Sequence, residues 1–366
     1  MLVEKAVYFK SGLSPCQLLS AVLSAGLQGL NSKNQILLGS GRDAIWILLQ
    51  DLRRCGYKRV MLPSYLCPSV ISPFEKTGTS YRLYKVDRDL RVDLDSIKAL
   101  SKEEKSPLLV IHYFGFPQQM DELLEFCERN ELILIGDCAQ SFLGKYAGTP
   151  LELIGDYGIL SYRKFLPVPK GGALTIRAES DADRLCSIRL QEANYAESLF
   201  STVTLMMKFL HSKSGLRPLR LITTLVNHLQ DFLETDGFPE RMDLITRRVM
   251  SKIDLDEVFR SRRENYEFIE KQLELEEVTP LHPDLPREVC PYGFPLLAEG
   301  RDSLVEFLRR RGIETSVDWR LPDYVTKNFP VSREISRRIL TLPVHQQLRR
   351  DQLLYILESI EAWART

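Results

Sequence analysis

The sequence has no C-x-x-C cysteine pair, no excess of charge of one sign and no apolar run as long as a membrane-spanning helix. Its seven cysteines are scattered, which argues against a zinc site or a disulfide framework and favours a reducing compartment. The 49 basic residues equal the 49 acidic residues in number, so charge gives no reason to expect nucleic acid or an anionic membrane as a partner. No apolar signal segment stands at the N-terminus. We therefore expect a cytoplasmic protein that binds no metal, no nucleic acid and no membrane.

The chain of 366 residues is longer than one compact core usually needs, so we expect two domains. The first, over 1–250, is predicted to be α/β, because short apolar runs alternate with amphipathic helices between residues 36 and 176. That alternation indicates a mostly parallel sheet with helices on both faces. Residues 185–242 are predicted to be a helical segment within this domain. The second domain, over 251–366, is predicted to be a smaller α+β unit with a strand near 313–319.

A lysine and an aspartate follow two of the predicted strands. Asp137 ends one apolar run, and Lys164 comes three residues after Ser161, which ends another. Because the carboxyl ends of parallel strands meet at one edge of a sheet, we expect both side chains at the same site. A lysine amine can form a Schiff base with an aldehyde cofactor, and a buried carboxylate can keep a pyridine nitrogen protonated. The pair indicates pyridoxal 5'-phosphate, with both residues catalytic; Lys170 is a weaker candidate, expected to be solvated or near the phosphate.

A short glycine-containing turn is the candidate phosphate site. Gly41 and Arg42 begin a predicted helix, whose N-terminus offers free N–H groups and a partial positive charge to an anion. Ser161 and Arg163 would complete the phosphate site from the neighbouring strand end. The alternative is an ordinary helix cap with no ligand.

Four further side chains are candidates for contact with cofactor or substrate. Gln140, three residues after Asp137, could contact the ring hydroxyl of the cofactor. His112 and Tyr65 each follow a predicted strand and could stack on or flank the ring, although packing in the core explains both equally well. Arg320, in the smaller domain, could hold a substrate carboxylate or phosphate through two hydrogen bonds, or could be a surface residue.

These segments together resemble the sugar aminotransferase family of the DegT/StrS type, within the fold-type I pyridoxal-phosphate enzymes. The landmarks are Ser40–Ala44, Leu62–Tyr65, Val110–Gly115, Gly136–Ser141, Leu160–Tyr162 with Gly171–Ala173, and Leu342–His345. The resemblance implies a seven-stranded-like sheet and a homodimer with its active site at the subunit interface. It implies that Lys164 holds the cofactor and that Asp137 contacts the pyridine nitrogen. It also implies a role in sugar biosynthesis: transfer of an amino group from an amino acid, commonly glutamate, to a keto acceptor, often a nucleotide-linked keto-sugar.

The chain departs from the family pattern at the lysine. The family has a longer gap between its serine and its lysine, and an ungapped comparison places Leu166 at the lysine position and Cys67 at the ring-stacking position. The family's Asn-x-Arg segment, which reaches across the dimer, is not recognisable. Two alternatives to an aminotransferase therefore stay open: another pyridoxal-phosphate reaction (lyase, dehydratase or desulfurase-like), or a protein that binds the cofactor without turnover.

Overall fold

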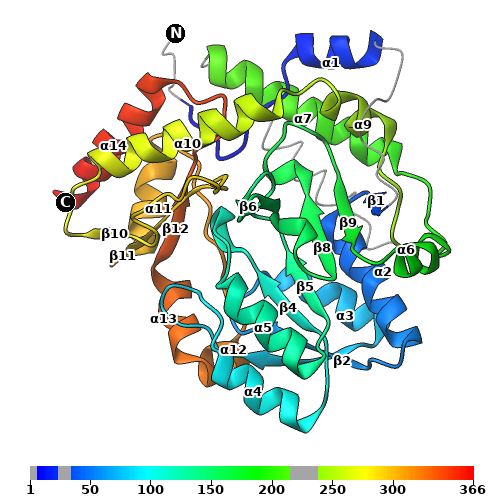
Figure 1. Cartoon of the computed structure of the whole chain (residues 1–366). Helices are drawn as coiled ribbons and strands as arrows, with labels where there is room; N and C mark the ends of the chain where they lie inside the picture. The colour runs from blue at the N-terminus through cyan, green and yellow to red at the C-terminus, as the bar shows by residue number, and fades with distance from the viewer. Residues whose placement is uncertain (1–5, 24–33, 215–237) are drawn as a thin grey trace.

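The computed structural model describes residues 6–23, 34–214 and 238–366, and its centre is a seven-stranded sheet (Figure 1). In spatial order the strands are β1 (Gln35–Leu38), β9 (Gly172–Ile176), β8 (Tyr157–Ser161), β5 (Leu134–Asp137), β4 (Leu108–Ile111), β2 (Arg59–Pro63) and β3 (Ser80–Tyr84). Neighbouring strands run parallel from β3 to β8, whereas β9 runs antiparallel to β8 and to β1. The predicted α/β class with a mostly parallel sheet is confirmed.

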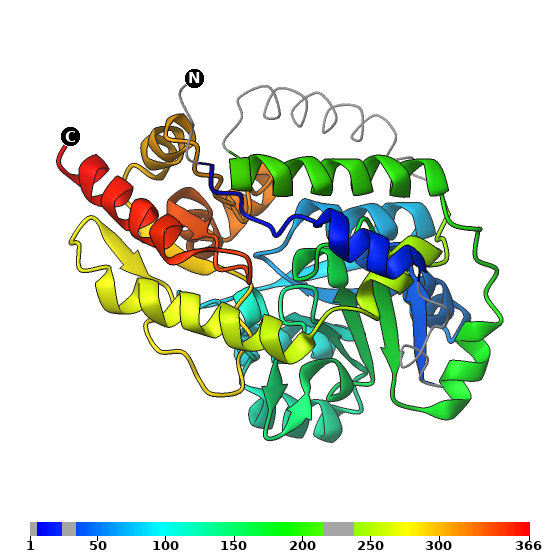
Figure 2. The same cartoon turned by 90° about the horizontal axis from the view of Figure 1, so that it is seen from above.

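Two pairs of helices cover the sheet. The helices α2 (Gly41–Arg54) and α3 (Ile71–Thr77) lie on one face, and α4 (Leu94–Glu103) and α5 (Met120–Asn130) lie on the other (Figures 1 and 2). This arrangement follows from right-handed crossovers. The connections through α2 and α3 lead to strands nearer β3 in the sheet, whereas those through α4 and α5 lead to strands nearer β9, so the two pairs of helices cover opposite faces. As a result, the carboxyl ends of β4, β5 and β8 lie at the same edge of the sheet as the N-terminus of α2.

Local chemistry fixes the N-terminus of α2. Ser40 is its N-cap, and its hydroxyl accepts a hydrogen bond from the backbone N–H of Asp43 at 3.2 Å. Gly172, at the start of β9, packs directly against this turn: a Cβ atom there would lie 2.3 Å from the carbonyl carbon of Ser40. A glycine at this position therefore lets the turn approach the sheet.

The C-terminal part holds a second sheet of three antiparallel strands. They are β10 (Val278–Pro280), β11 (Phe294–Ala298) and β12 (Ile339–Leu342), accompanied by α10 (Leu255–Gln272), α11 (Arg301–Arg310), α12 (Asp323–Asn328), α13 (Pro330–Arg338) and α14 (Arg350–Ala364). The prediction of a strand near 313–319 is wrong, since the segment makes only two isolated bridges, Ile313 with Val7 and Ser316 with Thr341. The reason is that the two bridges go to different partners, one in the N-terminal segment and one in β12, so no continuous ladder forms.

The remaining elements lie around the central sheet. They are α1 (Pro15–Leu23), β6 (Lys145–Tyr146), β7 (Thr149–Pro150), α6 (Glu179–Cys186), α7 (Tyr195–Ser214) and α9 (Leu244–Met250). The segment predicted to be helical, 185–242, contains α7, while its residues 215–237 lie outside the described part. None of the described helices is both long enough and apolar enough to cross a membrane. The division into two domains at residue 250 stays a prediction.

Candidate active site

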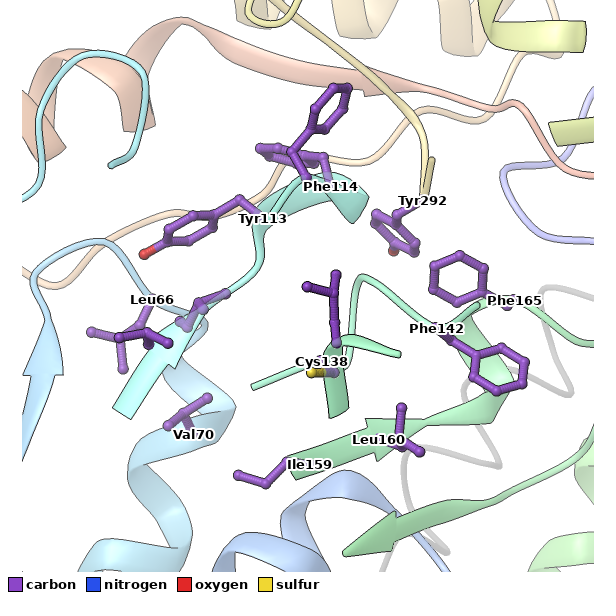
Figure 3. Packing of buried hydrophobic residues seen from close by; sticks show 14 of the residues in the cluster. Leu66, Val70, Tyr113, Phe114, Cys138, Phe142, Ile159, Leu160, Phe165 and Tyr292 are labelled. Carbon is purple, nitrogen blue, oxygen red and sulfur yellow. The ribbon is translucent and has the colours of Figure 1, made fainter. Parts of the chain in front are cut away.

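A cavity of about 290 Å³ lies at the carboxyl ends of β5 and β8, beside the N-terminus of α2. It brings together seven residues that the sequence singled out: Gly41, Arg42, Asp137, Gln140, Ser161, Arg163 and Lys164. Three of its apolar lining residues, Val70, Ile159 and Tyr292, belong to the buried cluster drawn in Figure 3. Polar groups thus converge from several elements on a space with partly apolar walls, as is usual for a small-molecule site.

Asp137 is the last residue of β5 and lies in the middle of the central sheet, opposite Ile111 of β4 and Ile159 of β8. It is 6% exposed, and its carboxylate accepts a hydrogen bond from the backbone N–H of Ala139 at 3.0 Å. Burial raises the pKa of Asp137, whereas the nearby positive charge of Lys164 lowers it. A cationic group in the cavity would therefore satisfy a carboxylate that is costly to bury alone.

Lys164 supplies the primary amine among the described residues that line the cavity. It ends a short 3₁₀ helix after β8, and its Nζ lies 5.7 Å from the centroid of the Tyr292 ring. The charge of Lys164 acts on Asp137 and also on Asp318, a second carboxylate that lines the cavity. Leu166, at the lysine position of the ungapped comparison, is instead 2% exposed in the hydrophobic core. Leu166 therefore belongs to the core, and Lys164 is the residue of this segment that presents an amine to the cavity.

The structure contradicts the expectation that Lys170 is solvated. Its Nζ donates a hydrogen bond to Glu197 at 2.6 Å and another to Glu240, and all three side chains are largely buried. Burial lowers the pKa of Lys170, but the hydrogen bonds and charges of the two carboxylates outweigh it and raise the pKa overall. A lysine held charged in this way is a poor nucleophile.

The candidate phosphate site is formed by the start of α2 and the end of β8. Ser40 caps the helix, and the N–H groups of the first turn of a helix have no acceptor within the helix itself. Gly41 lies close to β8, because a Cβ atom on it would be 3.4 Å from the Leu160 carbonyl oxygen. Arg42 and Arg163 line this cavity and also an adjoining one. Two guanidinium groups and a helix N-terminus form a favourable environment for a phosphate.

Gln140 carries a donor that has no partner among the residues described. Its Oε1 accepts a hydrogen bond from the backbone N–H of Phe114 at 3.1 Å, while its buried Nε2 bonds to nothing in the described ranges. Buried donors are normally satisfied, so this N–H group would suit a ligand oxygen in the cavity. The unpaired donor, the buried Asp137 and the anion site at α2 together fit the ring hydroxyl, ring nitrogen and phosphate of pyridoxal 5'-phosphate.

Tyr65 and His112 do not line the cavity, and each follows its core-packing alternative. Tyr65 is fully buried between Tyr113 and Trp319, at ring-centroid distances of 5.8 and 5.6 Å, and its hydroxyl donates to the backbone carbonyl of Asp318. The Nδ1 of His112 accepts a hydrogen bond from a backbone N–H at 3.2 Å, and burial lowers its pKa to about 4. The neutral imidazole of His112 is therefore part of the core rather than of the cavity wall.

Arg320 is also not directed into the cavity. Its side chain is 81% exposed and lies 4.0 Å from the carboxylate of Asp302 at the surface. Its neighbours in the chain, Asp318 and Trp319, line the cavity instead. Burial raises the pKa of Asp318, while hydrogen bonds from two hydroxyl groups and the charge of Lys164 lower it. The segment singled out in the sequence therefore reaches the cavity through Asp318 and Trp319, whereas Arg320 lies at the surface.

Cys67 and Tyr292 line the cavity as well, and neither was among the predicted site residues. Cys67 is partly exposed, and its Sγ lies 3.0 Å from the hydroxyl oxygen of Ser69. It stands where the resemblance placed the residue that stacks on the cofactor ring. Only the ungapped comparison with the family gave a signal for it.

The fold and the site define a fold-type I pyridoxal-phosphate enzyme. Comparison with known proteins makes this assignment specific: the model of the "DegT/DnrJ/EryC1/StrS aminotransferase family" matches residues 27–361, and the chain belongs to that family. The protein is thus a pyridoxal-phosphate-dependent aminotransferase, and the predicted family, enzyme class and cofactor are confirmed.

The similar proteins are distant in sequence. A pleiotropic regulatory protein of Geobacillus stearothermophilus is 22% identical over 91% of this chain and 86% of its own length. A UDP-N-acetyl-3-dehydro-alpha-D-glucosamine 3-aminotransferase of Acidithiobacillus ferrooxidans is 22% identical over 92% of this chain and 85% of its own. The structure of a putative sugar aminotransferase, Spr1654 from Streptococcus pneumoniae in its PLP form, matches with a TM-score of 0.70 at 15% identity, over 98% and 99% of the two chains. At this identity the structural likeness establishes the fold alone.

Proposed function

We propose that this protein transfers an amino group from an amino acid to a keto-sugar, with Lys164 as the lysine that holds pyridoxal 5'-phosphate. One observation carries the assignment of the lysine: Lys164 lines the same cavity as Asp137. The two other positions considered for the cofactor lysine do not offer a free amine, because Leu166 lies in the core and Lys170 forms buried ion pairs. The keto-sugar acceptor is supported by relatives named as aminotransferases of nucleotide-linked sugars.

Bound pyridoxal phosphate would supply an electron-withdrawing ring that stabilises negative charge at a substrate carbon. Asp137, which is buried and lines the cavity, would pair with the protonated ring nitrogen. Gln140 would donate its unpaired Nε2–H to the ring hydroxyl oxygen. The first turn of α2, with Arg42 and Arg163, would hold the phosphate. Lys164 would hold the cofactor through its Nζ, and the same amine would serve as the general base that removes the proton from the α-carbon of the donor.

A homodimer is part of the same proposal. It is supported by the family membership and by apolar side chains exposed along α7, where Leu199 is 57% and Val203 is 41% exposed. Exposed apolar residues repeated on one helix mark a candidate contact surface. The cytoplasmic location stays a prediction from the sequence.

The alternative that the sequence left open, a protein that binds the cofactor without turnover, is not adopted, because the chain belongs to an aminotransferase family and Lys164 lines the cavity.

A donor and acceptor screen that follows the visible absorbance of the cofactor tests the proposal. The purified protein is expected to show a visible band that shifts when an amino donor is added and returns when a keto-sugar acceptor follows. Lys164→Ala is expected to lose the band, while Lys145→Ala, which changes an exposed lysine, keeps it. A cofactor band that none of the amino donors shifts would contradict the proposed amino transfer.

A further inference from the structure

Asp318 is a second buried carboxylate of the active-site cavity, 4% exposed, and its hydrogen bonds come from neutral groups. Its Oδ1 accepts a hydrogen bond from the Ser316 hydroxyl at 2.9 Å, and its Oδ2 accepts one from the Thr341 hydroxyl at 3.0 Å. Among the described residues, no lysine or arginine forms an ion pair with this carboxylate. Burial raises the pKa of Asp318, while the two hydroxyl groups and the more distant charges of Lys164 and Lys10 lower it.

The segment that carries Asp318 is held in place from two sides. Ser316 and Thr341 of β12 exchange two backbone hydrogen bonds, at 3.0 and 2.8 Å, and Thr341 is fully buried. On the other side, the hydroxyl of Tyr65 donates to the backbone carbonyl of Asp318. The carboxylate therefore has a fixed position with supporting hydrogen bonds behind it, an arrangement that suits a group which binds a ligand.

The two hydroxyl groups do not use the whole acceptor capacity of the Asp318 carboxylate. An ionised carboxylate has two oxygens with about four lone-pair sites, and each oxygen of Asp318 accepts one printed-length hydrogen bond from the protein. A buried carboxylate without a cation is costly, so the acceptor sites that remain favour a hydrogen-bond donor from the cavity.

The proposed function leaves Asp318 without a part in holding the cofactor. Asp137 would face the ring nitrogen, Lys164 would bond to the aldehyde carbon, and Arg42 and Arg163 would hold the phosphate. Asp318 is thus the charged group of this cavity that stays available to a substrate.

Two aromatic residues, Trp319 and Tyr292, line the same cavity as Asp318. The Trp319 ring packs on the rings of Tyr65 and Tyr113, at centroid distances of 5.6 and 6.3 Å, and Tyr292 belongs to the buried cluster of Figure 3. Aromatic faces suit the C–H groups of a saturated ring, and a carboxylate suits the hydroxyl groups on its edge. The negative charge of Asp318 would repel the carboxylate of a keto acid.

We propose that Asp318 determines acceptor specificity: it accepts a hydrogen bond from a hydroxyl group of the acceptor and so selects a neutral, polyhydroxylated ketone over a keto acid. The inference rests on the proposed function, because it requires the acceptor to react in this cavity. It also reverses the charge expected of this segment. The sequence offered Arg320 as a clamp for an anionic group, but that side chain is 81% exposed, and the side chain that lines the cavity is an acid.

Two ketones that differ in their hydroxyl groups test the proposal on holoenzyme first converted to its amino form with an amino donor. These are scyllo-inosose, which has a hydroxyl group on every ring carbon except the carbonyl carbon, and cyclohexanone, which has none. Asp318→Asn is expected to raise the half-saturating concentration of scyllo-inosose by about tenfold or more and to change that of cyclohexanone by less than about twofold. The half-saturating concentration of 2-oxoglutarate should fall, because the repelling charge is gone. Asp323→Asn, at an exposed aspartate, is the control and should behave as wild type.

The ratio of the scyllo-inosose value to the 2-oxoglutarate value is taken on one preparation of each variant, so a loss of folded protein does not change it. Calorimetry with scyllo-inositol, which has no carbonyl group to react, gives a second measure: the wild-type holoenzyme should bind it, and Asp318→Asn should bind it about tenfold more weakly. An unchanged ratio, equal loss with both ketones, or a wild type that does not bind scyllo-inositol would overturn the assignment. If the wild type transfers an amino group to no ketone, the proposed function fails, while the calorimetry still decides whether Asp318 binds hydroxyl groups.

Discussion

Replacement of Lys170 by methionine tests whether this lysine stabilises the fold rather than holding the cofactor. The Lys170 side chain is 10% exposed and pairs with Glu197 at 2.6 Å and with Glu240. The substitution leaves these two carboxylates, 10% and 14% exposed, without their cation. Breaking a buried ion pair by removal of one partner costs about 3–5 kcal/mol. We expect the free energy of unfolding to fall by roughly that amount.

Urea denaturation of the cofactor-free protein measures this loss. Lys170→Met should unfold at lower urea concentration than wild type, whereas Lys145→Met, at an exposed lysine, should not. The triple variant Lys170→Met, Glu197→Gln, Glu240→Gln should recover part of the stability, because it leaves no buried charge uncompensated. The recovery is expected to be incomplete, since an amide oxygen at position 240 accepts the hydrogen bond from the backbone N–H of Asn194, 2.7 Å long in the wild type, more weakly than a carboxylate oxygen does.

Two results would refute this reasoning. In the first, Lys170→Met unfolds at the same urea concentration as wild type, so that the ion pairs contribute nothing to stability. In the second, the variant is as stable as wild type but no longer forms the visible cofactor band. The second result would assign the cofactor to Lys170 instead of Lys164.

Three further predictions concern the site and the core around it. Asp137→Asn should retain the cofactor but lower the rate of amino transfer about a hundredfold or more, because an amide cannot balance a charged ring nitrogen; a rate close to wild type in steady-state assays would contradict this role. Gly172→Ala should lower the free energy of unfolding by about 1–3 kcal/mol, because its Cβ would lie 2.3 Å from the Ser40 carbonyl carbon, whereas Gly41→Ala, with no contact closer than 3.4 Å, should lose little in the same urea experiment. Burial lowers the pKa of His112 from 6.5 to about 4, so its contribution to stability is complete above pH 6.5 and is lost as the pH falls toward 4; His112→Gln should make that decline shallower in urea titrations at several pH values.

Strand ends could be found from the sequence because buried parallel strands read as apolar runs followed by polar residues. This pattern located Asp137, Ser161 and Lys164, and the structure places all three at one cavity. The parallel α/β architecture followed from the same alternation of strands and helices. Local patterning was sufficient here because Asp137 and Ser161 end β5 and β8, and Lys164 follows β8 by three residues.

The direction of a side chain within a turn could not be predicted in the same way. Tyr65 and Cys67 are two residues apart after β2, yet Tyr65 is buried in the core and Cys67 lines the cavity. Asp318 and Arg320, also two residues apart, differ in the same way: Asp318 is buried and Arg320 is at the surface. Tertiary packing decides these directions, and a motif two residues wide carries no information about it.

Contacts between distant segments were also beyond the sequence. Lys170 looked like a solvated loop residue because its partners, Glu197 and Glu240, lie 27 and 70 residues further along the chain. A buried charge is recognisable only once the partners that surround it are known.

Chemical trapping of the cofactor is the most direct test of the central claim. Borohydride reduction of the holoenzyme fixes pyridoxal phosphate to its lysine, and peptide mass spectrometry after proteolysis identifies that residue. We predict the added mass on the peptide that contains Lys164, at Lys164. Trapping at Lys170, or no trapping at all, would contradict the claim that Lys164, in the same cavity as Asp137, holds the cofactor.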